Sequence, residues 1–387
     1  MPVHEARGES RDDEVTRALL TALMRPAEQP GARLEADKAA WTRGQTTSRL
    51  LEVTVIMGRR FGVSVFVLAA IVFGPLRAVP THAARTAAAP TPVSIALNWI
   101  KNVEFGGIWA AQKYGWWQQA GLNVTTRAYD YSTDPTVLVG AGKYTFGFQD
   151  AASLIIARAN GGVPVRAVWA SLQKSAFAFI TMPNSHITSV RDFKGKRIGY
   201  QVHQLYVLQT MLNSVGLNLS DVKLVPVQFD PNVLVVGRVD AYLAFITNEP
   251  IALSQVNHIK VNIIPASAYG YTFYGDVLFT TDAVIRSNPA LVRKVVAVMD
   301  RGWRYALAHP DEMAHTVVPA YDNTGDTVAQ QAAEMRALGP LSVASGEPIG
   351  SMGAARWQSG ISLLLKYKQI HANIPADSVF TTQFLPK

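Results

Sequence analysis

The sequence predicts an α/β fold for the part of the chain that begins near Val93. In that part, short segments in which apolar and polar residues alternate are followed by segments with the periodicity of a helix. The length of 387 residues allows two or three domains, and 49% hydrophobic residues are enough to form packed cores. We find no tandem repeat.

The first set of elements begins with a strand over residues 93–99, where Val93, Ile95, Leu97 and Trp99 alternate with smaller or polar residues. A helix is expected over 104–120, ended by Gly121. A further helix begins near Asp150 or Ala151. Further strands of this set are expected at residues 123–129, 143–148, 163–171 and 177–182.

A second set follows, and the chain then returns to a strand at 277–285. Ser287 is expected to cap a long helix that runs to Ala308, with Pro289 near its first turn. The remainder is mostly helical. The second set comprises a short helix, a glycine turn and a strand within residues 190–200, strands at 222–227, 238–245 and 259–264, and a helix at 204–215.

The segment before this body has the pattern of a secretory signal peptide. Residues 61–74 form an uncharged and mostly apolar run that follows Arg59 and Arg60, and small residues follow at 81–84. At 14 residues the run is shorter than the roughly 20 that a stable membrane span needs. We therefore expect a signal peptide at residues 57–84, starting at Met57, an over-extended translation start at 1–56, a linker at 85–92 and an exported body. The alternative is a genuine cytoplasmic segment followed by an uncleaved anchor.

Composition excludes several classes of function. The chain has no cysteine, so it has no disulfide framework, thiolate metal site or cysteine nucleophile. Its net charge of +8 is scattered, which is weak support for nucleic acid binding and suits an anionic ligand without requiring one. No GxSxG, HExxH or P-loop motif is present. We therefore expect no enzyme, catalytic residue, metal site, cofactor or nucleic acid partner.

Several short motifs, in this order and spacing, resemble the periplasmic substrate-binding proteins of ABC importers. The resemblance is to the family of SsuA and thiamine pyrimidine synthase, which holds sulfonate-, pyrimidine- and riboflavin-binding members. One departure is Tyr144-Thr145, where the family usually has Val-Asp. The motifs are ALNW at 96–99, GGIWAA at 106–111, GWWQQAGLNV at 115–124, GKYTFGFQDA at 142–151, DFKGKRIG at 192–199, GRVDAY at 237–242, TNEP at 247–250 and YGY at 269–271.

This resemblance implies a two-lobed periplasmic-binding-protein-like fold of type II, with a ligand cleft between hinged lobes. Lobe one is expected at 93–180 and 277–387, and lobe two at 181–276. The implied partners are a small planar heterocycle and a membrane permease with its ATPase, and a monomer is expected. The alternatives are a sulfonate- or nitrate-type binding protein, a sensory module, and a pyrimidine synthase. Such synthases use an iron-associated cysteine cluster that this chain lacks.

Ligands of open α/β sheets bind beyond the carboxyl ends of the strands, which selects residues in the first set of elements. Asn98 could bond a ring edge and Trp99 could stack on a ring. The helix start near Glu104 and Gly106 could receive an anionic tail. The alternative is that Trp99 belongs to the core and that the glycines only allow close packing. Gln149, Asp150 and Gln173 also end strands, although Asp150 could only cap its helix.

The same rule selects residues in the second set. Tyr200, Gln201 and Tyr206 form a segment rich in amides and phenols, which suits polar recognition rather than catalysis. Asn248 and Glu249 follow a strand, and a carboxylate there could accept hydrogen bonds from an aminopyrimidine or an imide. The alternative for Glu249 is a surface hinge residue. Tyr271 lies where the chain returns to lobe one, and aromatic packing there is equally compatible with the sequence.

Overall fold

The structure is a computed structural model that describes residues 89–130, 132–321, 325–343 and 347–386. These residues lie within one compact unit, Ala83–Lys387. The expected N-terminal extension and signal peptide, and residues 85–88 of the linker, lie outside the described residues. In the described part, no helix has the length and apolar character that crossing a membrane requires.

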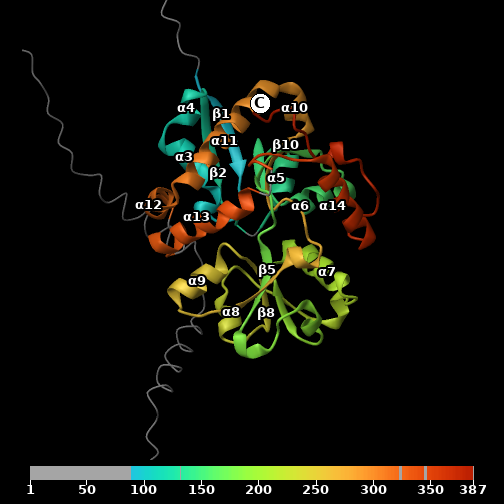
Figure 1. The fold of residues 1–387 in the computed structure, drawn as a ribbon. Coiled ribbons are helices and arrows are strands. Elements are labelled where there is room, and N and C mark those ends of the chain that lie inside the picture. The colour runs from blue at the N-terminus through green and yellow to red at the C-terminus, as the bar shows by residue number, and fades with distance from the viewer. Residues whose placement is uncertain (1–88, 131, 322–324, 344–346, 387) are drawn as a thin grey trace, which may run out of the picture. The chain divides into compact units, whose positions relative to one another are not determined.

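The first sheet forms the centre of lobe one (Figure 1). Its strand order is β2-β1-β3-β10-β4. The first three strands run parallel to one another, whereas β10 is antiparallel to both of its neighbours. The mixed sheet follows from the late return of the chain into lobe one. The strands are β1 Thr91–Ala96, β2 Leu122–Arg127, β3 Phe146–Gln149, β4 Val165–Leu172 and β10 Asp276–Thr281.

The second sheet has the same construction and forms the centre of lobe two. Its order is β7-β6-β8-β5-β9, with β6 parallel to β7 and β8, and β5 antiparallel to β8 and β9. The expected α/β fold with two lobes is therefore confirmed. The strands are β5 Phe177–Thr181, β6 Arg197–Tyr200, β7 Lys223–Pro226, β8 Ala241–Phe245 and β9 Asn262–Pro265.

The lobe boundary expected at residue 180 differs from the sheet membership of β5. This strand pairs with β8 and β9, so the chain leaves the first sheet between Leu172 and Phe177. All five residues of β5 are buried. A fully buried apolar strand lacks the alternation that would show which sheet it joins.

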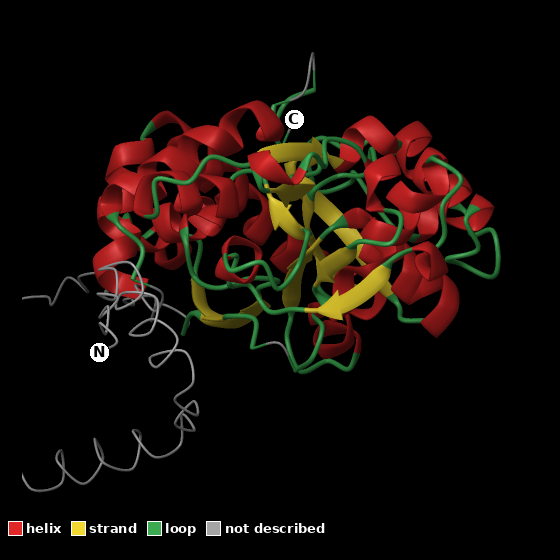
Figure 2. Ribbon diagram, turned by 90° about the horizontal axis from the view of Figure 1, so that it is seen from below, coloured by secondary structure: helices red, strands yellow, loops and turns green. Residues whose placement is uncertain are grey.

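Helices lie on both sides of the strands (Figure 2). The expected helix over 104–120 is wrong as a single element, because Gly115 has φ +66° and separates two shorter helices. The helices are α3 Gly106–Lys113, α4 Trp116–Gln119, α5 Pro135–Gly140, α6 Ala151–Gly161, α7 Leu205–Ser214, α8 Asn232–Val235, α9 Glu249–Val256, α10 Asp282–Ser287, α11 Pro289–Ala308, α12 Pro310–Tyr321, α13 Val328–Ser342 and α14 Ala354–Lys366.

Two other details differ from expectation. The strand expected over 277–285 ends at Thr281, where α10 begins, and Thr281 Oγ1 accepts a hydrogen bond from Val284 N at 3.1 Å. Asn288 rather than Ser287 caps α11, since Asn288 Oδ1 accepts from Leu291 N at 3.1 Å. Both residue types are good caps, and the capping side chain decides where a helix begins. The long helix itself, ending at Ala308, is confirmed.

Candidate functional site

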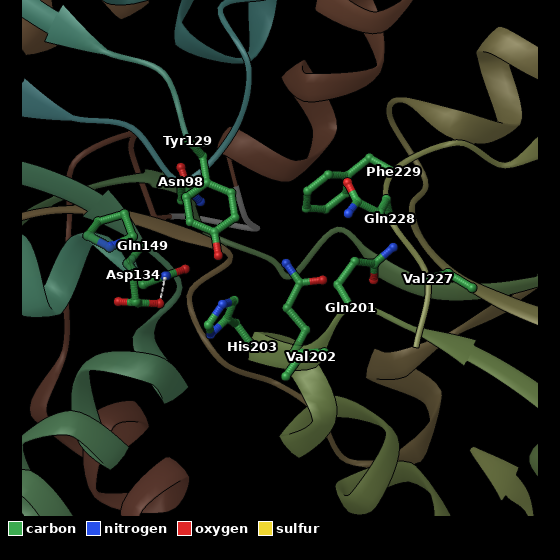
Figure 3. A pocket seen from close by; sticks show the side chains of 12 residues that line it. Asn98, Tyr129, Asp134, Gln149, Gln201, Val202, His203, Val227, Gln228 and Phe229 are labelled. Atoms are coloured by element: carbon green, nitrogen blue, oxygen red, sulfur yellow. Dashed lines mark hydrogen bonds between the residues drawn. The ribbon is translucent and has the colours of Figure 1, made fainter. Parts of the chain in front are cut away.

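The main cavity lies between the two lobes, beyond the carboxyl ends of β1, β3 and β6. Its volume is about 620 Å³, including space that is open to solvent. In Figure 3 the side chains from lobe one lie opposite those from lobe two. The lining residues are Asn98, Tyr129, Asp134, Pro135 and Gln149 from lobe one, and Gln201, Val202, His203, Gln204, Val227, Gln228 and Phe229 from lobe two.

Two amide side chains that line this cavity have a buried acceptor oxygen. Gln201 is 6% exposed, and its Nε2 donates to Tyr242 Oη and to the Leu243 carbonyl, both at 3.2 Å. Asn98 Nδ2 donates to Asp276 Oδ1 at 3.2 Å. Within the described part of the chain, Gln201 Oε1 and Asn98 Oδ1 have no hydrogen-bond partner. A buried acceptor left in this state favours a ligand that donates to it.

An aromatic pair separates the main cavity from two others. The rings of Trp99 and Phe229 meet edge to face with centroids 3.9 Å apart. A cavity of about 190 Å³ lies where Trp99 approaches Phe245, and a cavity of about 970 Å³ lies beside Asn248. Phe229 lines all three cavities. The three spaces are therefore parts of one interlobe region divided by this ring.

Three carboxyl groups are buried under the cleft without a cation. Glu104, Glu249 and Asp276 are at most 5% exposed, and none of them forms an ion pair with a described residue. Desolvation, and secondarily the charge of Glu249, raises the pKa of Glu104 to about 8. Desolvation also raises the pKa of Glu249 to about 7. The backbone N–H of Phe245 donates to Glu249 Oε2 at 2.8 Å, and this hydrogen bond opposes the rise in pKa. The pKa of Asp276 lies well above its usual range, chiefly because of burial and then because of Glu104.

Asp150 connects the lobes. Its carboxylate caps α6 by accepting from Ala152 N at 2.9 Å, as the alternative interpretation of the sequence expected. It also accepts from Tyr271 Oη at 3.0 Å and from the hydroxyl of Tyr206, which belongs to lobe two. Burial raises the pKa of Asp150 to about 6, and these two phenol hydrogen bonds oppose that shift.

A second carboxyl group that joins the lobes belongs to the C-terminal helices. Glu334 on α13 accepts from Asn248 Nδ2 at 3.1 Å, which joins α13 to the start of α9 in lobe two. Gln330 and Gln331 donate to the same carboxylate at 2.9 and 3.0 Å. Burial first, and the charge of Asp326 among the lesser causes, raises the pKa of Glu334 to about 8.

The structure sorts the thirteen expected site residues into three groups. Three of them line none of the three cavities: Gly106, Gln173 and Tyr200. Gly106 packs against Ala306 and Met335, and Gln173 Nε2 donates to the Ser351 carbonyl at 3.0 Å. Tyr200 is the last residue of β6. Four others lie behind the cleft, where Glu104, Asp150 and Tyr271 are buried and Tyr206 is half-buried. The six that line the cavities are Asn98, Trp99, Gln149, Gln201, Asn248 and Glu249.

Several lining residues were not expected from the sequence. Tyr129 follows β2, and Gln228 and Phe229 follow β7, so the rule of strand ends would have selected them. Asp134 caps α5 and accepts from Gln149 Nε2 at 2.8 Å. Asp326 and Gln330 belong to the C-terminal helical region, which no strand-based rule reaches.

Comparison with known proteins assigns this chain to a family. Residues 102–313 match the family described as NMT1/THI5 like. The chain belongs to this NMT1/THI5-like family. It is 29% identical to the riboflavin-binding protein RibY of Chloroflexus aurantiacus, over 61% of this chain and 68% of that protein. It is 23% identical to the formylaminopyrimidine-binding protein of Halalkalibacterium halodurans, over 81% of this chain and 96% of that protein.

Solved structures of this family's fold resemble the chain as well. The alkanesulfonate-binding protein SsuA of Xanthomonas axonopodis pv. citri, bound to MOPS, superposes with a TM-score of 0.59 at 15% identity, over 76% of this chain and all (100%) of that chain. The periplasmic aliphatic sulphonate binding protein SsuA of Escherichia coli has a TM-score of 0.57 at 14% identity, over 77% and 94% of the two chains. These likenesses confirm the periplasmic-binding-protein fold.

Proposed function

We propose that this chain is the extracytoplasmic solute-binding protein of an ABC importer. It binds a small planar heterocycle, a thiamine pyrimidine precursor or a riboflavin-like flavin, and delivers it to a membrane permease driven by an ATPase. We further propose that it is exported by the signal peptide at 57–84 and acts as a monomer. Its relatives named for riboflavin and formylaminopyrimidine binding support this class of ligand.

The observation that carries the proposal is the pair of unpartnered acceptor oxygens of Asn98 and Gln201. The ring of Trp99 lies next to Asn98 in sequence and lines the adjoining cavities. The amino group of a pyrimidine or the imide N–H of a flavin can donate to such oxygens while the ring packs on the indole. Binding that uses both lobes favours the closed state by the difference in affinity between the two states.

A sulfonate or nitrate ligand fits these cavities less well. Among the described residues, none that lines the three cavities is Lys or Arg. Such anions offer only acceptor oxygens, which cannot satisfy Asn98 Oδ1 or Gln201 Oε1. The carboxyl groups of Glu249 and Asp326 on the far side of Trp99 would also oppose a second negative charge.

Synthesis of a pyrimidine is the main alternative, since some relatives carry that name. The Legionella pneumophila protein named 4-amino-5-hydroxymethyl-2-methylpyrimidine phosphate synthase is 22% identical over 57% of this chain. This chain has no cysteine for the cluster that the resemblance associates with synthesis. We therefore propose that the bound compound is released unchanged, which mass spectrometry of the ligand after incubation would test.

Calorimetry with riboflavin, 4-amino-5-hydroxymethyl-2-methylpyrimidine and MOPS tests the ligand class. We expect at least one heterocycle to bind more tightly than MOPS. Gln201→Ala should weaken that binding by about tenfold, the usual effect of losing one good hydrogen bond to a ligand. Gln118→Ala, at an exposed position on α4, is the matched control. Binding of MOPS alone would refute the proposed ligand class.

A further inference from the structure

Phe229 lies where the three cavities of the interlobe region meet. It follows β7, and among the described residues it alone lines all three spaces. Its side chain is half-buried, whereas its neighbours Gln228 and Asp230 are exposed. In Figure 3 the ring of Phe229 lies beside Gln228 at the edge of the main cavity. This ring is therefore a wall that lobe two places between the lobes.

Two aromatic side chains of lobe one contact the ring of Phe229. Trp99 meets it edge to face with centroids 3.9 Å apart, and Tyr129 meets it edge to face with centroids 6.4 Å apart. Trp99 lines the other two cavities but not the main one. A ligand in the main cavity therefore reaches Phe229 before it reaches the indole of Trp99.

The space that Phe229 leaves next to Trp99 and Gln201 is small. We call it the Trp99 slot, a cavity of about 190 Å³ with the rings of Trp99, Phe177, Phe229 and Phe245 among its walls. Its neighbours measure about 620 and 970 Å³, and all three volumes include space open to solvent. Gln201 lines both the slot and the main cavity, and its buried Oε1 has no partner among the described residues. A ring that stacks on Trp99 and donates to Gln201 must fit into this slot.

We propose that Phe229 is the specificity-determining residue of the cleft and limits the ligand to a single-ring heterocycle. A fused tricyclic flavin that stacked on Trp99 would extend into the volume that the Phe229 ring occupies, whereas a single pyrimidine ring has no further ring to place there. Packed side chains yield to such overlap only at a cost in free energy. This inference rests on the proposed function, which leaves pyrimidine and flavin open, and it selects the pyrimidine.

Calorimetry on the full chain with 4-amino-5-hydroxymethyl-2-methylpyrimidine and riboflavin tests the size limit. We expect the native chain to bind the pyrimidine at least about tenfold more tightly than riboflavin. Phe229→Ala joins the Trp99 slot to both of its neighbours, so the affinity for riboflavin should rise by about tenfold or more. The affinity for the pyrimidine should fall several-fold, because an aromatic contact is lost.

Two further variants separate the bulk of the Phe229 ring from other effects. Phe229→Leu keeps most of the bulk without the aromatic ring, so it should weaken pyrimidine binding and still discriminate against riboflavin. Tyr367→Ala is the matched control, because Tyr367 is also a half-buried aromatic residue but lines none of the three cavities. It should leave the preference unchanged. Thermal unfolding identifies the variants that are folded.

The outcomes separate this inference from the proposed function. Riboflavin binding to the native chain as tightly as the pyrimidine, or more tightly, overturns the size limit and leaves the heterocycle proposal standing. A folded Phe229→Ala variant with the native preference also overturns it, as does an equal gain of riboflavin affinity in Phe229→Leu. If neither compound binds to the native chain, both proposals are refuted. The comparison on the native chain decides the size limit even if Phe229→Ala does not fold.

Discussion

Burial raises the pKa values of three glutamates above the ordinary value of 4.5. The pKa is about 8 for Glu104, about 7 for Glu249 and about 8 for Glu334. A carboxyl group with a higher pKa in the folded chain than in the unfolded chain binds more protons when folded, at every pH between the two values. These groups therefore stabilise the fold fully below about pH 4.5, and this contribution is lost as the pH rises toward 8.

The first prediction is that the free energy of unfolding falls between about pH 6 and pH 8, by up to about 1.4 kcal/mol per pH unit for each of these groups. Glu104→Gln should flatten this slope by about one group's share, because glutamine does not titrate. Urea unfolding at several pH values measures the slope. Asp377→Asn serves as the exposed control. The same slope in Glu104→Gln and the native chain would contradict the assignment.

Single residues of the cleft could be predicted where a strand identifies them. Asn98 follows β1 and Gln201 follows β6, and both line the main cavity. Phe229 was not predicted although it follows β7, because an isolated aromatic in a polar loop resembles a packing residue. Asp326 lies far along the chain, and only tertiary contact with lobe two brings it to the site.

At the scale of elements, α3 and α11 cross unusually closely. A Cβ placed on Gly302 would lie 2.1 Å from the carbonyl oxygen of Gly107, and a Cβ on Gly107 would lie 2.1 Å from the Trp303 ring. Real Cβ atoms do not approach other atoms this closely, so the two glycines permit the contact. The start of α3, just after Glu104, is held in place by this crossing.

The second prediction is that Gly302→Ala destabilises the fold by roughly 2 kcal/mol or more, because the backbone of α3 must move away. Thermal and urea unfolding measure the change. Gly353→Ala is the matched control: this residue is exposed, has an extended backbone and meets only Tyr274 Oη at 3.9 Å. The control should cost about 1 kcal/mol or less, since alanine is a poorer N-cap than glycine, and clearly less than Gly302→Ala. Similar stabilities of the two variants would show that the helices can separate at little cost.

Elements were predicted well where the pattern is long and poorly where it is short. The twenty residues of α11 show one apolar stripe, and in β1 the buried Val93 and Ile95 flank the less buried Ser94, as the alternation predicted. In contrast, α5 and α8 have 6 and 4 residues, too few turns for a periodicity to appear. Gly115 separates α3 from α4 although the apolar residues continue across it, so composition alone could not reveal the break.

For the whole molecule, direct hydrogen bonds hold the two lobes together. Tyr206 of lobe two donates to Asp150 of lobe one, and Asn248 donates to Glu334. Gln369 Nε2 donates to the Tyr206 carbonyl at 3.2 Å and to Thr210 Oγ1 at 3.0 Å, which joins the C-terminal region to α7. The resemblance to a family predicted two lobes, but which side chains join them depends on packing that no motif specifies.

The last prediction concerns the Tyr206–Asp150 hydrogen bond. This bond joins the two lobes, so it should stabilise the state in which they are closed on each other. Tyr206→Phe removes the hydroxyl but keeps the aromatic ring, and we expect it to lower the fraction of molecules in the closed state. A hydrogen bond to a charged group contributes about 1.5–3 kcal/mol, so the closed-to-open ratio should fall roughly tenfold or more. We expect a larger radius of gyration without ligand, measured by small-angle X-ray scattering, and an affinity for the heterocycle that is lower by up to about tenfold.

Tyr367→Phe is the matched control, since the Tyr367 hydroxyl makes no hydrogen bond within the described residues. It should change neither the radius of gyration nor the affinity. A Tyr206→Phe variant with lower affinity and an unchanged radius would place the hydroxyl at the ligand instead of at the lobe interface. A variant unchanged in both would show that other interlobe contacts determine closure, with the bond between Asn248 and Glu334 as the next to test.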